Sequence, residues 1–345
     1  MKNNVVYLSA IALGLFAASC SDKNQPMPEP VNESGAVSFR AAVPKAPRSA
    51  STTTSTIKEF IVYAYTGGKP YMQDVHVTRN GSSWVYSPVM YWPNTPVNFY
   101  AFSPNITNVP ATAQPELGSI PSYKNNGTTD LLYAVNMGEV AKATPVSMNF
   151  RHALSRVTIM LSSSNSKIGV RVSYVKLHNV YLQGTFNFPQ ATTSPDFPDN
   201  VGNWDNLKMS NDMMVFAVIG DEDIFDLTPT PVDITDNNLG ISYFLPQPLT
   251  QLDFDGTAYS GNGIEVDCEI YDTATGAKIW PNAATPPAQL VPESPTGRLF
   301  FPVTTDAVDK WEMGHEYIYN ITIDNPDVLK PIIFDVTVDD FLLEQ

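Results

Sequence analysis

The sequence has few charged residues, and acidic residues outnumber basic ones. Charged residues make up 16% of the 345 positions, and 35 Asp and Glu outnumber 20 Lys and Arg, which gives a formal net charge of −15. Domains that bind nucleic acids carry a basic face, and no basic stripe is found here, so we expect no nucleic-acid partner. An acidic surface rich in Thr, Ser and Asn favours an exported protein.

Helix-forming patterns are also missing. No segment of about 11 residues or more repeats its apolar positions with a period of 3.6. Instead the chain holds 29 prolines, 16 tyrosines and 17 phenylalanines, and many short alternating segments end in Pro, Gly, Asn or Asp. This composition predicts an all-β protein. A chain of this length suits two domains.

Cysteine is scarce, with two in the chain. Cys20 ends a leader in which Lys2 precedes an apolar run of roughly 14 residues, too short to span a bilayer comfortably. The small residues 17–19 stand directly before Cys20, as a signal peptidase requires. The leader resembles a bacterial lipoprotein signal, so residues 1–19 are the expected signal peptide and Cys20 the expected lipidation site. A plain secretory leader with an incidental cysteine is the alternative.

The second cysteine, Cys268, has no partner if Cys20 is lipidated. It lies in an alternating segment, "GIEVDCEIYD", and we expect a small buried residue there. Residues 20–35 are polar and Pro-rich, which is typical of a flexible tether.

The patterns in the rest of the chain are typical of strands and turns. The segment "AVSFRAAV" alternates apolar and other residues, "IKEFIVYAYT" is apolar on both faces, and Asn80-Gly81 predicts a hairpin. We place two domains at residues 36–152 and 153–345, touching each other across the short junction "RHALS". A boundary near 190–205, where the composition is more linker-like, is the alternative.

Several strand sequences resemble the fimbrillin-like family of surface lipoproteins, the subunits of type V pili. The resemblance covers nearly the whole chain after position 36 and depends on the order of three motifs. These are Phe150-x-His152-x-Leu154-x-x-Val157, Tyr91-Trp92-Pro93, and Trp311-x-x-Gly314-x-x-Tyr317-x-Tyr319.

The resemblance implies two tandem transthyretin-like β-sandwich domains. It also implies a precursor that is exported, lipidated and displayed on the outer membrane before it enters a fimbrium. A trypsin-like protease cuts the loop after the first strand, and the C-terminal strand of the next subunit fills the groove left by that strand. Other pilin subunits are then the partners, together with a host or bacterial surface receptor in adhesion.

The residues are compatible with such an exchange. The expected displaced strand presents four apolar residues on one face, namely Val37, Phe39, Ala41 and Val43. The expected donor strand, "IIFDVTV", does the same with Ile332, Phe334, Val336 and Val338. Cleavage needs an exposed basic residue between the first two strands, and Arg48 in a Ser/Thr-rich loop is the first candidate, with Lys45 second.

Other chemistry has weaker support. The acidic segment Asp221–Asp236 lacks the spacing of a calcium loop, and His315 has no second histidine at zincin spacing. No G-x-S-x-G text is present, so we expect no enzyme, no cofactor and no metal site. Trp84 and Trp92 stand in strand-like contexts and are expected in the core. The competing hypothesis is a surface lipoprotein that binds glycans or host ligands and never polymerises.

Overall fold

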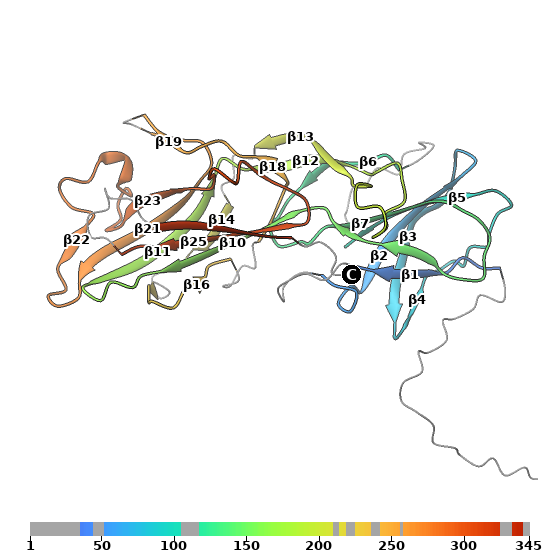
Figure 1. Cartoon of the computed structure of the whole chain (residues 1–345), viewed down its shortest axis with the longest axis horizontal. Coiled ribbons are helices and arrows are strands. Elements are labelled where there is room, and N and C mark those ends of the chain that lie inside the picture. The colour runs from blue at the N-terminus through green and yellow to red at the C-terminus, as the bar shows by residue number, and fades with distance from the viewer. Residues whose placement is uncertain are drawn as a thin grey trace, which may run out of the picture.

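The computed structural model describes residues 35–43, 52–104, 117–209, 214–218, 225–235, 242–255, 258–324 and 333–340. Over these residues the protein is all-β, as predicted, with one 3₁₀ turn, η1 (Pro287–Gln289), as its helical element. The molecule is elongated, with the first half of the chain at one end and the second half at the other (Figure 1). Within the described part, no helix is long and apolar enough to cross a membrane.

The N-terminal half is built on a six-stranded sheet. Its strand order is β4 (Ser83–Val85), β3 (Lys69–Asn80), β2 (Glu59–Thr66), β5 (Val97–Ser103), β7 (Leu132–Glu139) and β9 (Arg151–His152). Asn80 pairs with Ser83, and Gly81 has a φ of 62°, so the predicted hairpin is confirmed. Glycine tolerates this left-handed conformation because it has no Cβ.

Both faces of this sheet are covered, which explains why β2 is apolar throughout. Phe60, Val62 and Ala64 pack into one core cluster, and Ile61 and Tyr63 pack into another on the opposite face. The first cluster lies under β1 (Phe39–Ala42) and β8 (Val146–Asn149). The second lies under a three-stranded sheet made of β6 (Ser119–Lys124), β12 (Tyr181–Asn187) and β13 (Asn203–Met209).

The C-terminal half is a two-layer sandwich around one core cluster. One layer contains β16 (Val232–Asp233), β10 (Ser155–Ser162), β25 (His315–Thr322) and β26 (Ile333–Asp340), with β17 (Tyr243–Phe244) also paired to β10. The other contains β14 (Met214–Val218), β11 (Ile168–His178), β21 (Gly263–Asp272) and β22 (Lys278–Trp280), with β15 (Phe225–Asp226) on β11 and β23 (Gly297–Pro302) on β21. Two short pairs complete the half, β18 (Gln247–Pro248) with β24 (Lys310–Trp311) and β19 (Asp253–Phe254) with β20 (Tyr259–Ser260).

Packing crosses the boundary expected at residue 152. Strands β12 and β13 come after it, yet β12 pairs with β6 of the first half. The linker-like segment near 190–205 is also docked on the first half, because the Thr193 hydroxyl donates to the Asn149 carbonyl at 2.7 Å and accepts from the Val135 amide at 3.0 Å. The division into 36–152 and 153–345 therefore stays a prediction.

Several single-residue expectations can be compared with the fold. Cys268 is fully buried, as predicted, and burial raises the pKa of its thiol. Trp84 and Trp92 pack against the first core cluster and remain partly exposed. In the acidic segment, Asp233 accepts hydrogen bonds from the amide and the hydroxyl of Thr235 at 2.9 and 2.6 Å.

Candidate strand-exchange site

The first strand lies at an edge of the N-terminal half. Among the described strands, β1 pairs with β8 alone, in parallel, with Phe39 opposite Val146 and Ala42 opposite Asn149. Two backbone amides of the β8 side, those of Val146 and Phe150, donate to carbonyls of the first strand at 2.8 Å each. Since the hydrogen bonds to β8 run along one side of β1, fewer of them oppose its removal than would hold a central strand.

The predicted alternation of the first strand is observed. Val37, Phe39 and Val43 are buried, whereas Arg40 is exposed. Ala41 is half-buried and packs against the same core cluster.

Phe39 is the main anchor of β1. Its ring makes edge-to-face contacts with Phe60, Tyr86 and Phe99, at centroid distances of 6.0, 5.6 and 5.7 Å. Such pairs stabilise beyond the area they bury, by about 0.5–1.5 kcal/mol each. The strand is thus held by hydrogen bonds to β8 and by buried apolar side chains, among which Phe39 makes the aromatic contacts.

Open space borders the strand. A groove of about 220 Å³ runs beside β1 and is lined by Phe39, Ala41 and Trp84 among others. At the start of β1, Ala36 bridges to Tyr91, and the Val37 amide donates to the Met90 carbonyl at 2.7 Å.

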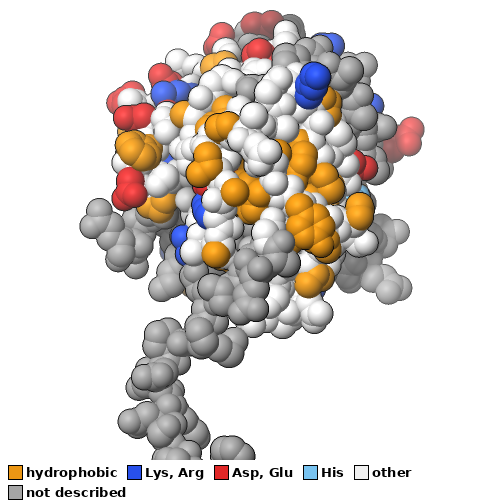
Figure 2. Space-filling model, turned by 90° about the vertical axis from the view of Figure 1, so that its right-hand side faces the viewer, with side chains coloured by type: hydrophobic (Ala, Val, Ile, Leu, Met, Phe, Trp, Pro, Cys, Tyr) orange, Lys and Arg blue, Asp and Glu red, His pale blue; other side chains and the backbone are white. Residues whose placement is uncertain are grey.

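Apolar side chains gather on the end of the N-terminal half that Figure 2 faces. The exposed large apolar residues of the two segments 85–91 and 138–145 are Val85, Val89, Tyr91 and Val140. Tyr91, 60% exposed, lies directly beside the start of β1 through its bridge to Ala36. The surface beside the start of the first strand is therefore apolar.

The described residues at both ends of the connection between β1 and β2 are held by hydrogen bonds. The Val43 amide donates to the Thr54 hydroxyl at 2.8 Å, and that hydroxyl donates to the Val43 carbonyl at 2.9 Å. The Thr52 amide donates to Asp130 at 2.8 Å, and the same carboxylate contacts buried His152 at 2.9 Å. The expected cleavage residues Lys45 and Arg48 lie outside the described residues, as does Cys20.

The expected donor strand is β26, an edge strand of the C-terminal half. It pairs with β25 in an antiparallel register that puts Phe334 opposite Ile321, Val336 opposite Tyr319 and Val338 opposite Tyr317. Ile332 lies outside the described residues. Residues 325–332, which precede this strand, also lie outside the described part of the chain, and the hydrogen-bonded partner of β26 among the described strands is β25.

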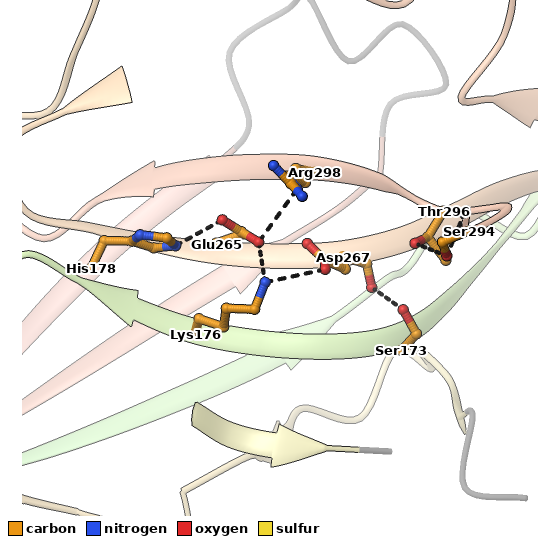
Figure 3. Close-up of polar contacts among 8 residues, drawn as sticks. All are labelled: Ser173, Lys176, His178, Glu265, Asp267, Ser294, Thr296 and Arg298. Carbon is orange, nitrogen blue, oxygen red and sulfur yellow. Dashed lines mark hydrogen bonds and ion pairs between the residues drawn. The ribbon is translucent and has the colours of Figure 1, made fainter. Parts of the chain in front are cut away.

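A polar site that the sequence did not lead us to expect lies on the outer face of the β11–β21–β23 sheet (Figure 3). Glu265 is 3% exposed, and its carboxylate lies 2.5 Å from Lys176 Nζ and 2.7 Å from His178 Nε2. Arg298 Nε lies 3.7 Å from the same carboxylate, and Asp267 Oδ2 lies 3.4 Å from Lys176 Nζ. The alternation of acidic and apolar residues in "GIEVDCEIYD" was the available signal, because it places Glu265 and Asp267 on the face opposite the core.

The two carboxylates of this site differ in their protonation. Burial alone would raise the pKa of Glu265, but contacts with His178 and Lys176 outweigh it and lower the pKa to about 2. Burial and the neighbouring Glu265 carboxylate raise the pKa of Asp267 to about 7. Near neutral pH, Glu265 is therefore charged and Asp267 titrates.

We expect Asp267→Asn to stabilise the protein at pH 8 by on the order of 2 kcal/mol relative to the wild type, and much less at pH 5. The pKa of Asp267 is about 7 in the fold, against about 3.9 in an unfolded chain, so wild-type stability falls as the pH rises between these values. Asparagine removes this dependence while keeping the shape. Thermal unfolding at both pH values checks the difference, with exposed Asp205→Asn as the control. An equal shift at pH 5 and pH 8 would contradict the assignment.

These observations define an all-β protein of two packed halves, with an edge strand at each end of the chain. A fimbrial protein from Bacteroides vulgatus has a similar structure, with a TM-score of 0.58 and 13% identity over 88% of this chain and 99% of that one. A candidate cell adhesion protein from Bacteroides uniformis matches with a TM-score of 0.52 and 13% identity over 90% and 99%. At such identity the likeness shows that the fold is shared.

The chain belongs to the fimbrillin-like family, whose sequence profile matches residues 48–340. The resemblance seen in the sequence motifs is thereby confirmed. Among curated protein sequences, none matches this chain.

Proposed function

We propose that this protein is a structural subunit of a bacterial surface fimbrium that polymerises by donor-strand exchange. The observation that carries the proposal is the state of β1, an edge strand bonded to β8 and anchored in the core by Phe39. A strand held in this way leaves an apolar groove and unpaired backbone groups when it is removed. Strand addition fills such an edge with hydrogen bonds, while side-chain pockets select the incoming strand.

The energetics favour exchange over simple loss of the strand. Burying four apolar side chains contributes on the order of 6–12 kcal/mol, at about 1.5–3 kcal/mol each. The first strand supplies one small side chain, Ala41, beside open space in the groove. The proposed donor residues Ile332, Phe334, Val336 and Val338 are all larger than alanine, so a neighbour's strand would bury more apolar area than β1 does.

The route to the surface follows from the leader. We propose that Cys20 is acylated and that the lipid anchors the precursor in the outer membrane with the chain exposed at the cell surface. A trypsin-like protease then cuts after Arg48 or Lys45, and the mature subunit enters the fimbrium. The role is structural and adhesive rather than enzymatic, and its partners are other pilin subunits and a host or bacterial surface receptor.

The exposed apolar residues at the end of the N-terminal half support the same assignment. Val89 and Tyr91 are exposed beside the start of β1, where a neighbouring subunit would approach. Contiguous exposed apolar side chains mark interaction surfaces in soluble domains.

Trace trypsin is expected to release residues up to Arg48 and to start polymerisation of the purified chain. We expect Arg48→Ala to slow this by more than about tenfold if it is the main site, since trypsin cleaves exposed basic residues in accessible loops. N-terminal sequencing of the product identifies the bond, and Lys45→Ala and Arg40→Ala serve as matched variants. Cleavage after Arg40, inside β1, would contradict the proposed site, and a product that stays monomeric would favour the glycan-binding alternative.

A further inference from the structure

The strand that leaves the groove in the proposed exchange and the strand that enters it match place by place. Residues 37–43 are "VSFRAAV" and residues 332–338 are "IIFDVTV". When the two segments are aligned in the same chain direction without a gap, the aromatic residue of each takes the third place, Phe39 in one and Phe334 in the other. The fourth place is charged in both, but with opposite sign. The two strands therefore have a common register as well as a common period.

The third place of β1 is the one that selects a particular side chain. The Phe39 ring meets three aromatic rings at centroid distances of 5.6–6.0 Å. These rings belong to Phe60, Tyr86 and Phe99, and together they form what we call the aromatic socket. Edge-to-face packing requires a ring, and Phe334 is the aromatic one among the four alternating apolar residues of the donor strand. A slip of two residues would place Ile332 or Val336 in the socket and lose the ring contacts.

The groove also constrains the direction of the incoming strand. A reversed donor strand over the same four places would put Val336 in the aromatic socket and the Phe334 ring at the half-buried place of Ala41. A reversed strand shifted to bring Phe334 into the socket would put Lys330 at the place of Val43, which is 7% exposed. Burying an unpaired ammonium is costly. A donor strand that runs in the direction of β1, parallel to β8, avoids both mismatches.

Charge favours the same register. The two charged residues that line the groove in the described structure are both arginines, Arg40 and Arg79. Arg40 leaves with β1, and in the aligned register Asp335 takes its place, so a like-charged neighbour of Arg79 is exchanged for an oppositely charged one. The Ser147 hydroxyl, which accepts from Arg40 Nε at 2.7 Å, can donate to a carboxylate instead.

We propose that the donor strand enters in the direction of β1, with Phe334 in the aromatic socket, Asp335 beside Arg79 and Val336 at the place of Ala41. This inference rests on the proposed strand exchange, and it makes Phe334 the residue that determines which register and which strand are accepted. In strand addition the backbone hydrogen bonds are the same for every sequence, so the pockets for alternate side chains provide the specificity.

Disulfide formation between subunits measures the register. In the pairing of β1 with β8, residue 40 lies opposite Ser147 and residue 42 opposite Asn149. The proposal therefore puts Asp335 of one subunit opposite Ser147 of the next, and Thr337 opposite Asn149. Adjacent strands lie about 4.7–4.9 Å apart, which is within the separation of roughly 4.4–6.8 Å between Cα atoms that a disulfide requires.

Two full-length double variants are the test, Ser147→Cys with Asp335→Cys and Asn149→Cys with Thr337→Cys. After nicking and polymerisation under oxidising conditions, each is expected to give a ladder that survives boiling in SDS and collapses with reductant. The matched control, Asn149→Cys with Asp335→Cys, is expected to give a ladder that boiling removes. The native cysteine left after cleavage at Arg48 is Cys268, which is fully buried and does not interfere.

Peptides test the aromatic socket separately. The Phe334→Ala form of the peptide 331–342 is expected to need at least about tenfold more peptide than the native form to hold nicked wild-type chain as a monomer. A peptide that carries both Phe334→Val and Val336→Phe keeps composition and alternation but moves the ring by two places. It is expected to lose as much, and Val338→Ala to lose less.

The possible failures can be told apart. A boiling-resistant ladder from the control variant in place of the two test variants, a link through Ser147 and Asp335 without the second link, or equal blocking by the peptide with the displaced ring would overturn the register and leave strand exchange intact. The absence of any ladder from nicked wild-type chain would overturn strand exchange, and this inference with it. The unboiled ladder and thermal unfolding of the uncut chain verify that each variant folds and polymerises.

Discussion

A chain that lacks residues 331–345 is expected to form no polymer after controlled nicking, whereas the intact chain forms an SDS-resistant ladder. The deletion removes β26 and with it the proposed donor residues Phe334, Val336 and Val338. The groove of β1 is left intact, so the shortened chain can still accept a strand. Mixed with nicked intact protein, it should therefore end growing chains and shift the ladder to short species. Gel electrophoresis without boiling measures both effects.

The deletion also exposes the edge of β25, so folding must be verified by circular dichroism and thermal unfolding. A peptide of residues 331–342 provides a second test on the unaltered chain. Added in excess to nicked wild-type protein, it should occupy the groove and hold the protein as a monomer. A peptide with Phe334 and Val336 replaced by aspartate is the matched control. A normal ladder from the shortened chain would exclude its C-terminal strand as the donor.

Phe39→Ala is expected to lower the free energy of unfolding of the uncut protein by about 3–5 kcal/mol. The side chain is 4% exposed and contacts three aromatic rings, so its loss removes buried area and leaves a cavity. Urea unfolding at equilibrium measures the change. Ala42→Ser, at an exposed position of the same strand, should change it by less than about 0.5 kcal/mol.

The same substitution has a second expected outcome that tests exchange itself. Cleavage after Arg48 releases residue 39 with the first strand, so polymers made from the Phe39→Ala chain should be as stable as wild-type polymers. Nicked variant protein should also polymerise faster, because the outgoing strand is held less firmly. Polymers that retain the instability of the variant would show that β1 stays in place.

Much of the architecture could be predicted from local patterns. The alternation of Val37, Phe39, Ala41 and Val43 predicted a half-buried first strand because successive side chains point to opposite faces. The continuous apolar run of β2 predicted burial on both faces, and Asn80-Gly81 predicted the hairpin that joins β3 to β4. Each of these signals lies within a few residues of sequence.

The remaining features depend on distant segments. No pattern in residues 181–209 predicted that β12 and β13 cover the N-terminal half. The linker-like composition around Thr193 instead suggested a segment that packs against neither half. The β6 and β13 strands were missed because neither alternates regularly, and β13 is also largely exposed. The polar site of Figure 3 was missed because it joins residues from β11, β21 and β23, which are far apart in the chain.

Side-chain periodicity and motif order are local properties of the chain, and they were sufficient to identify an all-β protein of the fimbrillin-like family. Tertiary structure alone decided that β1 is an edge strand bonded to β8, and that Glu265 meets Lys176, His178 and Arg298 on a buried outer face. The physical reason is that strand pairing and desolvation are set by the neighbours brought together in space, and sequence spacing does not specify them.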